Sequence, residues 1–220
     1  NKKKFIIHNG PFENTDSQSM NFFCLGELIP KDSDWVWLLG DDDKLENNSI
    51  LEVCKTLEKD NDKNLDLIIA CCSKRSSNSK RIVKRKIFDL CNEYGYHEIL
   101  GWISSLILRP KNMINILQDT YLCRGLFVVD DPSLKINSKY PYSAYPHSFS
   151  ILRFLSNKNG IFIDIPLVDT QNDNQSQKNI NQWIDDDVMK RYLLVIDDLQ
   201  RLLNSGSIKK GSCTKNFFRY

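Results

Sequence analysis

The sequence predicts an α/β domain built around a mostly parallel β-sheet, and two observations carry this prediction. Strongly apolar runs of strand length, such as residues 65–72, alternate with segments in which apolar residues recur at helical spacing. The apolar runs show no polar face, as expected for central strands that helices cover on both sides. The chain is therefore predicted to be one covered sheet with a C-terminal helical extension.

The predicted elements follow one another in a regular order. Strands are expected within residues 2–10, at 34–40 and 65–72, at the end of the basic segment 73–86, and at 100–110 and 160–170. Helices are expected within residues 16–31, at 47–60 and 111–122, from His147 onward, and at 180–206. We assign residues 1–171 to the sheet domain and residues 172–220 to a polar loop, a long amphipathic helix and a basic-aromatic tail.

The composition limits which partners and which cellular compartment we expect for this protein. The 220 residues carry a net charge of +2, so no global field would recruit nucleic acid, and no nucleic-acid partner is expected. Seven cysteines without metal-site spacing indicate free thiols in a reducing compartment. No apolar run is long enough to cross a bilayer, and no signal peptide is visible. We expect a cytoplasmic protein, although a leader lost ahead of Asn1 stays an alternative.

Three consecutive aspartates follow the apolar run at residues 34–40. Adjacent carboxylates repel one another near an apolar interior unless a cation lies between them. Asp41 and Asp43 can converge on one ion, while Asp42 turns away or binds through water. Hard oxygen ligands suit Mg²⁺ or Mn²⁺. The alternative is a solvated turn that caps the following helix.

A second triplet of aspartates, at residues 185–187, provides an internal comparison. It lies near the predicted start of the longest helix, where acidic side chains are favoured by the helix dipole and face solvent. We interpret this triplet as structural. The count of carboxylates therefore explains nothing by itself, and the position of residues 41–43 after an apolar strand is what indicates a metal site.

From about Lys4 to Gln171 the chain resembles the family 2 glycosyltransferases of the Rossmann-like GT-A fold, particularly bacterial enzymes that build surface polysaccharides. Residues 8–53 look like the family's Asn-containing turn, helix, apolar strand, DxD motif and following helix. "GWISSLILRPKNM", "YPHSFSILRFL" and "GIFIDIPLVDT" resemble its acceptor-side strand, acceptor-side helix and the late strand that returns under the active site.

The resemblance implies a metal-dependent transferase. It would move a sugar from a nucleotide-diphosphate sugar to a hydroxyl of a glycan or lipid-linked glycan acceptor in bacterial polysaccharide synthesis. Asp41 and Asp43 would bind Mn²⁺ or Mg²⁺, and Asn9, Gly10, Asp41 and Asp42 would contact the donor. That cation would bridge the two phosphates of the donor.

The resemblance leaves the catalytic base open. Inverting members typically place a carboxylate near the start of the acceptor-side helix, and this chain has "YPHS" there. His147 could be the base, a contact to the metal or diphosphate, or a structural residue. Asp131, beside Asp130, and Glu98, beside His97, are the rival bases, and each could equally belong to a turn.

A second departure concerns the start of the chain. Members of the family usually begin with a strand, a helix and a second strand that carry the base- and ribose-binding residues. This sequence starts at the later Asn-containing turn. We expect a chain that is N-terminally truncated relative to the family, without the residues that select the nucleotide, and a donor pocket that is built differently is the alternative.

Three other functions remain open. A phosphatase or phosphotransferase of the haloacid dehalogenase type also carries DxD after a strand, but it usually has Thr or Val where Leu45 stands. A nucleotidyltransferase would use a similar acid pair. A non-catalytic interaction module is the third, because the basic residues 74–86 and the tail "KNFFRY" could contact an anionic membrane surface or a partner. Peripheral contact through the tail is compatible with the transferase.

Overall fold

The computed structural model describes residues 24–40, 43–60, 62–72, 79, 81–123, 145–170 and 187–218. Its strands are β1 (Val36–Trp37), β2 (Asp43–Leu45), β3 (Leu65–Cys72), β4 (Ile82–Lys86), β5 (Leu106–Leu108) and β6 (Asn159–Thr170). Its α-helices are α2 (Ser49–Asp60), α3 (Ile87–Tyr94), α4 (Tyr96–Leu100), α5 (Pro110–Cys123), α6 (Pro146–Leu155) and α8 (Asp187–Asn204). Residues 24–28 are also helical, and 3-10 turns lie at η2 (Ile103–Ser105) and η5 (Lys215–Phe218).

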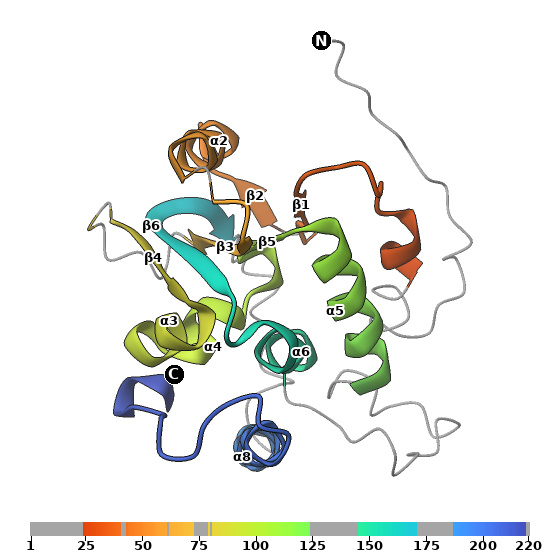
Figure 1. Ribbon diagram of the computed structural model, residues 1–220, viewed down its shortest axis with the longest axis vertical. Coiled ribbons are helices and arrows are strands. Elements are labelled where there is room, and N and C mark those ends of the chain that lie inside the picture. Colours follow the sequence, from red (N-terminus) through yellow and green to blue (C-terminus); the bar gives the residue numbers. More distant parts are fainter. Residues whose placement is uncertain are drawn as a thin grey trace.

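The strands form one curled sheet with helices on both of its faces (Figure 1). The strand order is β1-β5-β3-β6-β2, and β4 pairs with β6 next to this path. The protein is therefore of the mixed α/β class, as predicted. The expected strands at residues 65–72 and 160–170 and the expected helix at residues 47–60 are confirmed.

The direction of the strands differs from the prediction of a mostly parallel sheet. Among the described strands, only β3 and β6 pair in parallel, and the other four pairings are antiparallel. The strand expected at residues 34–40 is the short β1, which lies at one end of the strand order and is half-buried. An apolar strand shows that both faces are covered, but coverage by helices does not fix strand direction.

Two apolar clusters occupy the two faces of the sheet, and β3 contributes to both. Leu67, Ile69 and Cys71 face one cluster, while Ile68 and Ala70 face the other. The first cluster is formed with helices α3, α4, α5, α6 and α8, and the second with α2. This alternation follows from the two-residue period of a strand. Figure 1 shows α2 on one side of the sheet and α3, α4 and α6 on the other.

The C-terminal residues belong to the same core as the sheet. Val195, Leu199 and Leu202 on α8 are buried, as the predicted amphipathic helix requires. Ile208 and Phe217 continue this contact beyond the helix. Within the described ranges, no helix has the length and apolar content needed to cross a membrane.

The basic segment ends in an edge strand, as predicted. In β4 every residue except Val83 is exposed, and β4 pairs only with β6 among the described strands. Helix α3, which the sequence analysis did not anticipate, follows directly and packs against β6. A Cβ atom at Gly160 would lie 2.8 Å from Cγ1 of Ile87, so glycine permits this close approach.

Candidate functional site

The last aspartate of the acidic turn begins strand β2. Asp43 is 8% exposed, and its backbone nitrogen donates to the Gly40 carbonyl at 3.3 Å. In the antiparallel pairing of β2 with β6, Asp43 lies opposite Thr170 and Lys44 lies opposite Asp169. The end of the late strand is therefore beside the acidic turn, although more than a hundred residues separate the two in sequence.

A tryptophan side chain holds the Asp43 carboxylate. The indole Nε1 of Trp102 donates to Oδ2 of Asp43 at 3.0 Å. Such a bond orients a buried carboxylate. It also partly offsets the free energy that the carboxylate loses when it leaves water. Asp43 is thus the predicted metal ligand for which the structure supplies a supporting contact.

The residues after Trp102 hold the strand that precedes the acidic turn. The hydroxyl of Ser104 accepts a hydrogen bond from the Gly40 nitrogen at 2.8 Å, and the Ser104 carbonyl accepts one from Nε1 of Trp37 at the same distance. Ser104 is itself fully buried. The segment 102–105 therefore fixes both the end of β1 and the start of β2.

His147 contacts the two residues that precede this segment. It lies in the first turn of α6 and makes backbone hydrogen bonds with Leu100 and Gly101, and the neighbouring Ser148 hydroxyl donates to the Leu100 carbonyl at 2.8 Å. Its Nε2 is buried and has no hydrogen-bond partner among the described residues. Desolvation lowers the pKa of His147 to about 4, against the backbone hydrogen bonds, which act to raise it.

Gly101 lies where these contacts meet. A Cβ atom there would be 2.5 Å from the His97 carbonyl oxygen and 2.8 Å from the His97 ring. Any residue other than glycine would therefore force the backbone or the His97 ring to shift. The His97 ring lies 4.3 Å from the ring of Tyr145, the residue before α6. The imidazoles of His97 and His147 thus both lie close to Gly101.

The structure brings two of the predicted site residues to one segment. Asp43 contacts Trp102, and His147 contacts the two residues just before it. Glu98 is half-buried on α4, which ends at Leu100, two residues before Trp102. The remaining predicted site residues, Asn9, Gly10, Asp41, Asp42 and Asp131, lie outside the described residues.

The described residues do not form a complete metal site. Among them, no group of three or more His, Cys, Asp or Glu side chains could hold an ion. Asp43 offers one carboxylate with a supporting donor, which is the way proteins usually orient a metal ligand. The predicted partner ligand, Asp41, is among the residues left undescribed.

Sequence reasoning missed Trp102 and Ser104 as parts of the site. The signal was present in "GWISS", where small and polar residues interrupt an otherwise apolar run. Residues of this kind inside a buried segment need hydrogen-bond partners. Their partners are the polar groups of the acidic turn and β1, which only the fold brings near.

Comparison of the chain with models of known protein families and with curated proteins finds no match. The resemblance of the sequence to family 2 glycosyltransferases therefore rests on the motifs and on the arrangement of the segments that carry them.

Proposed function

We propose that this protein is a metal-dependent glycosyltransferase that uses a nucleotide-diphosphate sugar and a glycan or lipid-linked glycan acceptor. The observation that carries the proposal is the hydrogen bond from Trp102 to Asp43. It joins the aspartate of the DxD-like motif to the segment that resembles the family's acceptor-side strand.

Two further contacts support this assignment. The segment that resembles the late strand runs beside the acidic turn, because β6 pairs with β2 up to Thr170. The segment that resembles the acceptor-side helix is α6, and its His147 contacts the backbone next to Trp102. Contacts thus connect β2 to the late strand and, through Trp102 and the two residues before it, to the start of α6.

The proposed reaction breaks the bond between the anomeric carbon and the diphosphate oxygen, and the bonding electrons leave with the diphosphate. The acceptor oxygen bonds to the anomeric carbon and gives its proton to a base. A bound Mn²⁺ or Mg²⁺ supplies charge neutralisation on the leaving diphosphate. Asp43 would contribute one carboxylate ligand, and Trp102 would keep that carboxylate oriented.

We assign the base to His147. Its low pKa keeps the ring neutral above about pH 4, so the imidazole can accept a proton. Burial makes the protonated ring costly in the free protein. A diphosphate bound near the acidic turn would oppose this cost and raise the pKa toward the working range. Glu98 and Asp131 are the alternative bases. A His147→Gln variant tests them, because the variant would stay active if either of these residues were the base.

A thermal-shift screen of nucleoside diphosphates with and without Mn²⁺ tests the proposal. At least one nucleotide should stabilise the protein only when the metal is present. Asp43→Asn should abolish that shift, since it removes the charge and keeps the shape. Glu58→Gln is the matched control, because Glu58 is exposed on α2 and the change in charge is the same.

The outcome of the screen separates the competing functions. The transferase assignment should be dropped if no nucleotide gives a metal-dependent shift, or if Asp43→Asn shifts as the native chain does. Release of inorganic phosphate from a phosphate ester without any sugar acceptor would instead indicate a phosphatase. Transfer of a labelled sugar to an acceptor, lost in His147→Gln, would establish the base.

A further inference from the structure

The C-terminal segment, residues 205–220, concentrates positive charge. It contains three lysines and one arginine and no acidic residue, whereas the whole chain has a net charge of only +2. Lys209, Lys210 and Lys215 are exposed, and none of them forms an ion pair within the described residues. An electrostatic field therefore projects from this segment although the molecule is nearly neutral.

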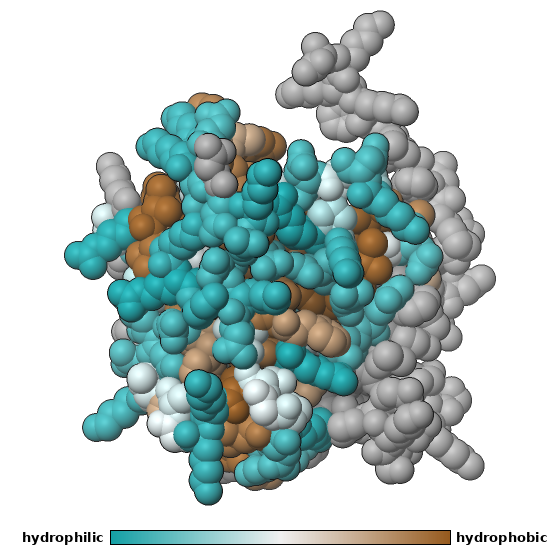
Figure 2. All heavy atoms as spheres, viewed as in Figure 1, coloured by the Kyte–Doolittle hydropathy of each residue, from teal (hydrophilic) through white to brown (hydrophobic). Residues whose placement is uncertain are grey.

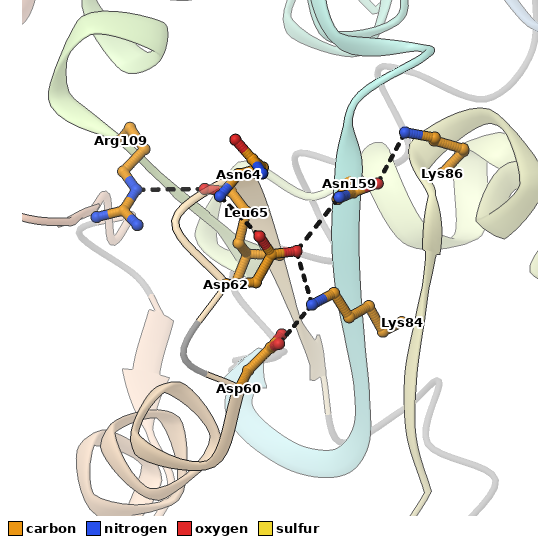
Figure 3. A network of polar contacts seen from close by, with 8 residues as sticks. All are labelled: Asp60, Asp62, Asn64, Leu65, Lys84, Lys86, Arg109 and Asn159. Atoms are coloured by element: carbon orange, nitrogen blue, oxygen red, sulfur yellow. Dashed lines mark hydrogen bonds and ion pairs between the residues drawn. The ribbon is translucent and has the colours of Figure 1, made fainter.

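The described basic residues of strand β4 are compensated by their own surroundings. Lys84 on β4 forms ion pairs with Asp60 and Asp62, as Figure 3 shows. Arg85 pairs with Glu93 at 3.3 Å.

Lys86, the last residue of β4, donates to the side-chain oxygen of Asn159 at 2.9 Å. The described basic residues of this strand thus form contacts within the fold. The three C-terminal lysines differ in lying within seven residues of one another with no ion pair among the described residues, so their combined charge is available to an external partner.

Hydrogen bonds hold the C-terminal segment against the rest of the domain. The Asn92 side chain donates to the Ser212 carbonyl at 3.0 Å and accepts from the Thr214 nitrogen at 2.9 Å. The Ser156 hydroxyl donates to the Ser207 carbonyl at 2.6 Å. The lysines therefore project from a segment that these contacts fix. Figure 2 shows hydrophobic atoms reaching the surface at the bottom of the view, where Figure 1 places α8.

The two adjacent phenylalanines of this segment have opposite environments. Phe217 is fully buried against Tyr96 and Phe88. Phe218, whose ring lies 5.4 Å from that of Phe217, is 54% exposed. An aromatic ring exposed in the same short segment as these lysines matches the chemistry of a membrane interface, where the ring enters the headgroup layer and the cations meet lipid phosphates.

We propose that residues 209–218 form a docking surface for an anionic lipid membrane. Lys209, Lys210 and Lys215 supply electrostatic attraction to the headgroups, and Phe218 supplies a small apolar insertion. Each lysine near such a surface contributes roughly fivefold in affinity, so three of them give about a hundredfold preference for anionic over neutral lipid. The proposal does not rest on the transferase assignment.

Co-sedimentation with vesicles tests the proposal. The probes are vesicles of phosphatidylcholine alone and of phosphatidylcholine with about one third phosphatidylglycerol, at low and high salt. The protein should bind the anionic vesicles at least about tenfold more tightly, and the difference should shrink at high salt. The triple variant Lys209→Glu, Lys210→Glu, Lys215→Glu should lose the binding, and Phe218→Ser should weaken it severalfold.

A matched variant controls for net charge. Lys31, Lys63 and Lys111 are exposed elsewhere on the molecule, and replacing all three by Glu changes the net charge by the same −6, from +2 to −4. This control should keep vesicle binding. Circular dichroism melts should show that both triple variants are folded, since none of the six side chains is buried.

Three results would overturn the proposal. The first is absence of binding to anionic vesicles by the native chain. The second is an equal loss of binding in the two triple variants, which would point to net charge alone. The third is tight, salt-dependent binding of single-stranded nucleic acid together with weak binding of vesicles, which would assign the lysines and Phe218 to nucleic acid.

Discussion

The indole Nε1 of Trp102 donates a hydrogen bond to Oδ2 of Asp43 at 3.0 Å, although 59 positions separate the two residues in the sequence. The bond links the start of β2 to the segment between α4 and β5. Because Asp43 is buried and charged, a donor that stays in place contributes both stability and orientation. This contact gives the most direct test of the site.

We expect Trp102→Phe to lower the free energy of unfolding by about 1–3 kcal/mol, because the buried carboxylate loses its donor. Urea unfolding measures this change. In a double-mutant cycle with Asp43→Ala, which removes the acceptor, the two effects should be less than additive, as expected for residues in contact. Trp35→Phe is the control, since Trp35 stacks on Arg109, a contact that Phe can retain. Strict additivity of Trp102→Phe and Asp43→Ala would show that the contact contributes nothing.

His147 should make stability depend on pH between about 6.5 and 4. The pKa of His147 is lowered to about 4 in the folded protein, so in this window the unfolded chain binds a proton that the folded chain does not. Stability must therefore fall as the pH falls, by up to about 3 kcal/mol over the window.

Urea unfolding at pH 7.5, 6, 5 and 4 checks this expectation. His147→Gln should flatten the profile, because the variant has no titrating group at this position. The hydrogen bond with Lys84 is the main cause that lowers the pKa of Asp62, so the stability that this carboxyl contributes is lost mainly below about pH 3.8, beneath the window of His147. An unchanged slope in His147→Gln would show that another group carries the dependence.

The sequence predicted the elements of the fold better than their arrangement. The strand at residues 65–72 and the helix at residues 47–60 follow from local apolar periodicity, which is a property of short segments. The antiparallel pairing of β5 with β3 depends on the path of the chain through α3 and α4, and no local pattern specifies it. Helix α3 was missed because it directly follows the exposed strand β4 without an obvious stop signal.

The candidate site shows the same division. The acidic turn was recognisable from its charge after an apolar run, and its last member, Asp43, is buried beside the end of β6. Trp102 could not be assigned to it, because an isolated tryptophan in an apolar segment reads as core. His147 was recognised only through its position at a helix start, and its buried Nε2 depends on tertiary packing.

Lys84 should stabilise the junction between α2, β3 and β4. Its ammonium group pairs with Asp60 and with Asp62, the latter at 2.7 Å, and these hydrogen bonds raise its pKa. Because the side chain is 38% exposed, solvent and salt weaken the pairs. Lys84→Met should therefore lower the urea midpoint slightly in dilute buffer. The difference should vanish in about 1 M NaCl, where the screening length is about 3 Å.

Lys86→Met is the control for that experiment. Lys86 bonds the neutral side chain of Asn159, so its replacement should show little dependence on salt. A salt-independent loss in Lys84→Met would mean that the methylene chain of Lys84, and not its charge, supports the junction.

Phe217 should anchor the whole C-terminal segment. Its ring is completely buried, lies nearly parallel to that of Tyr96 at 5.2 Å, and contacts Phe88 at 5.7 Å. Phe217→Ala removes this ring from the core and should cost about 3–5 kcal/mol in the free energy of unfolding. Phe218→Ala, one residue further on, should change it by no more than about 0.5 kcal/mol, because that side chain is mostly exposed.

Limited proteolysis of the same two variants locates the effect. In Phe217→Ala the lysines at positions 209, 210 and 215 should become susceptible to trypsin under native conditions, since the segment would lose its buried anchor. Phe218→Ala should be cut at the native rate. If both variants were cut alike while their unfolding free energies differed, the hydrogen bonds of Asn92 and Ser156, and not Phe217, would be what holds the segment to the domain.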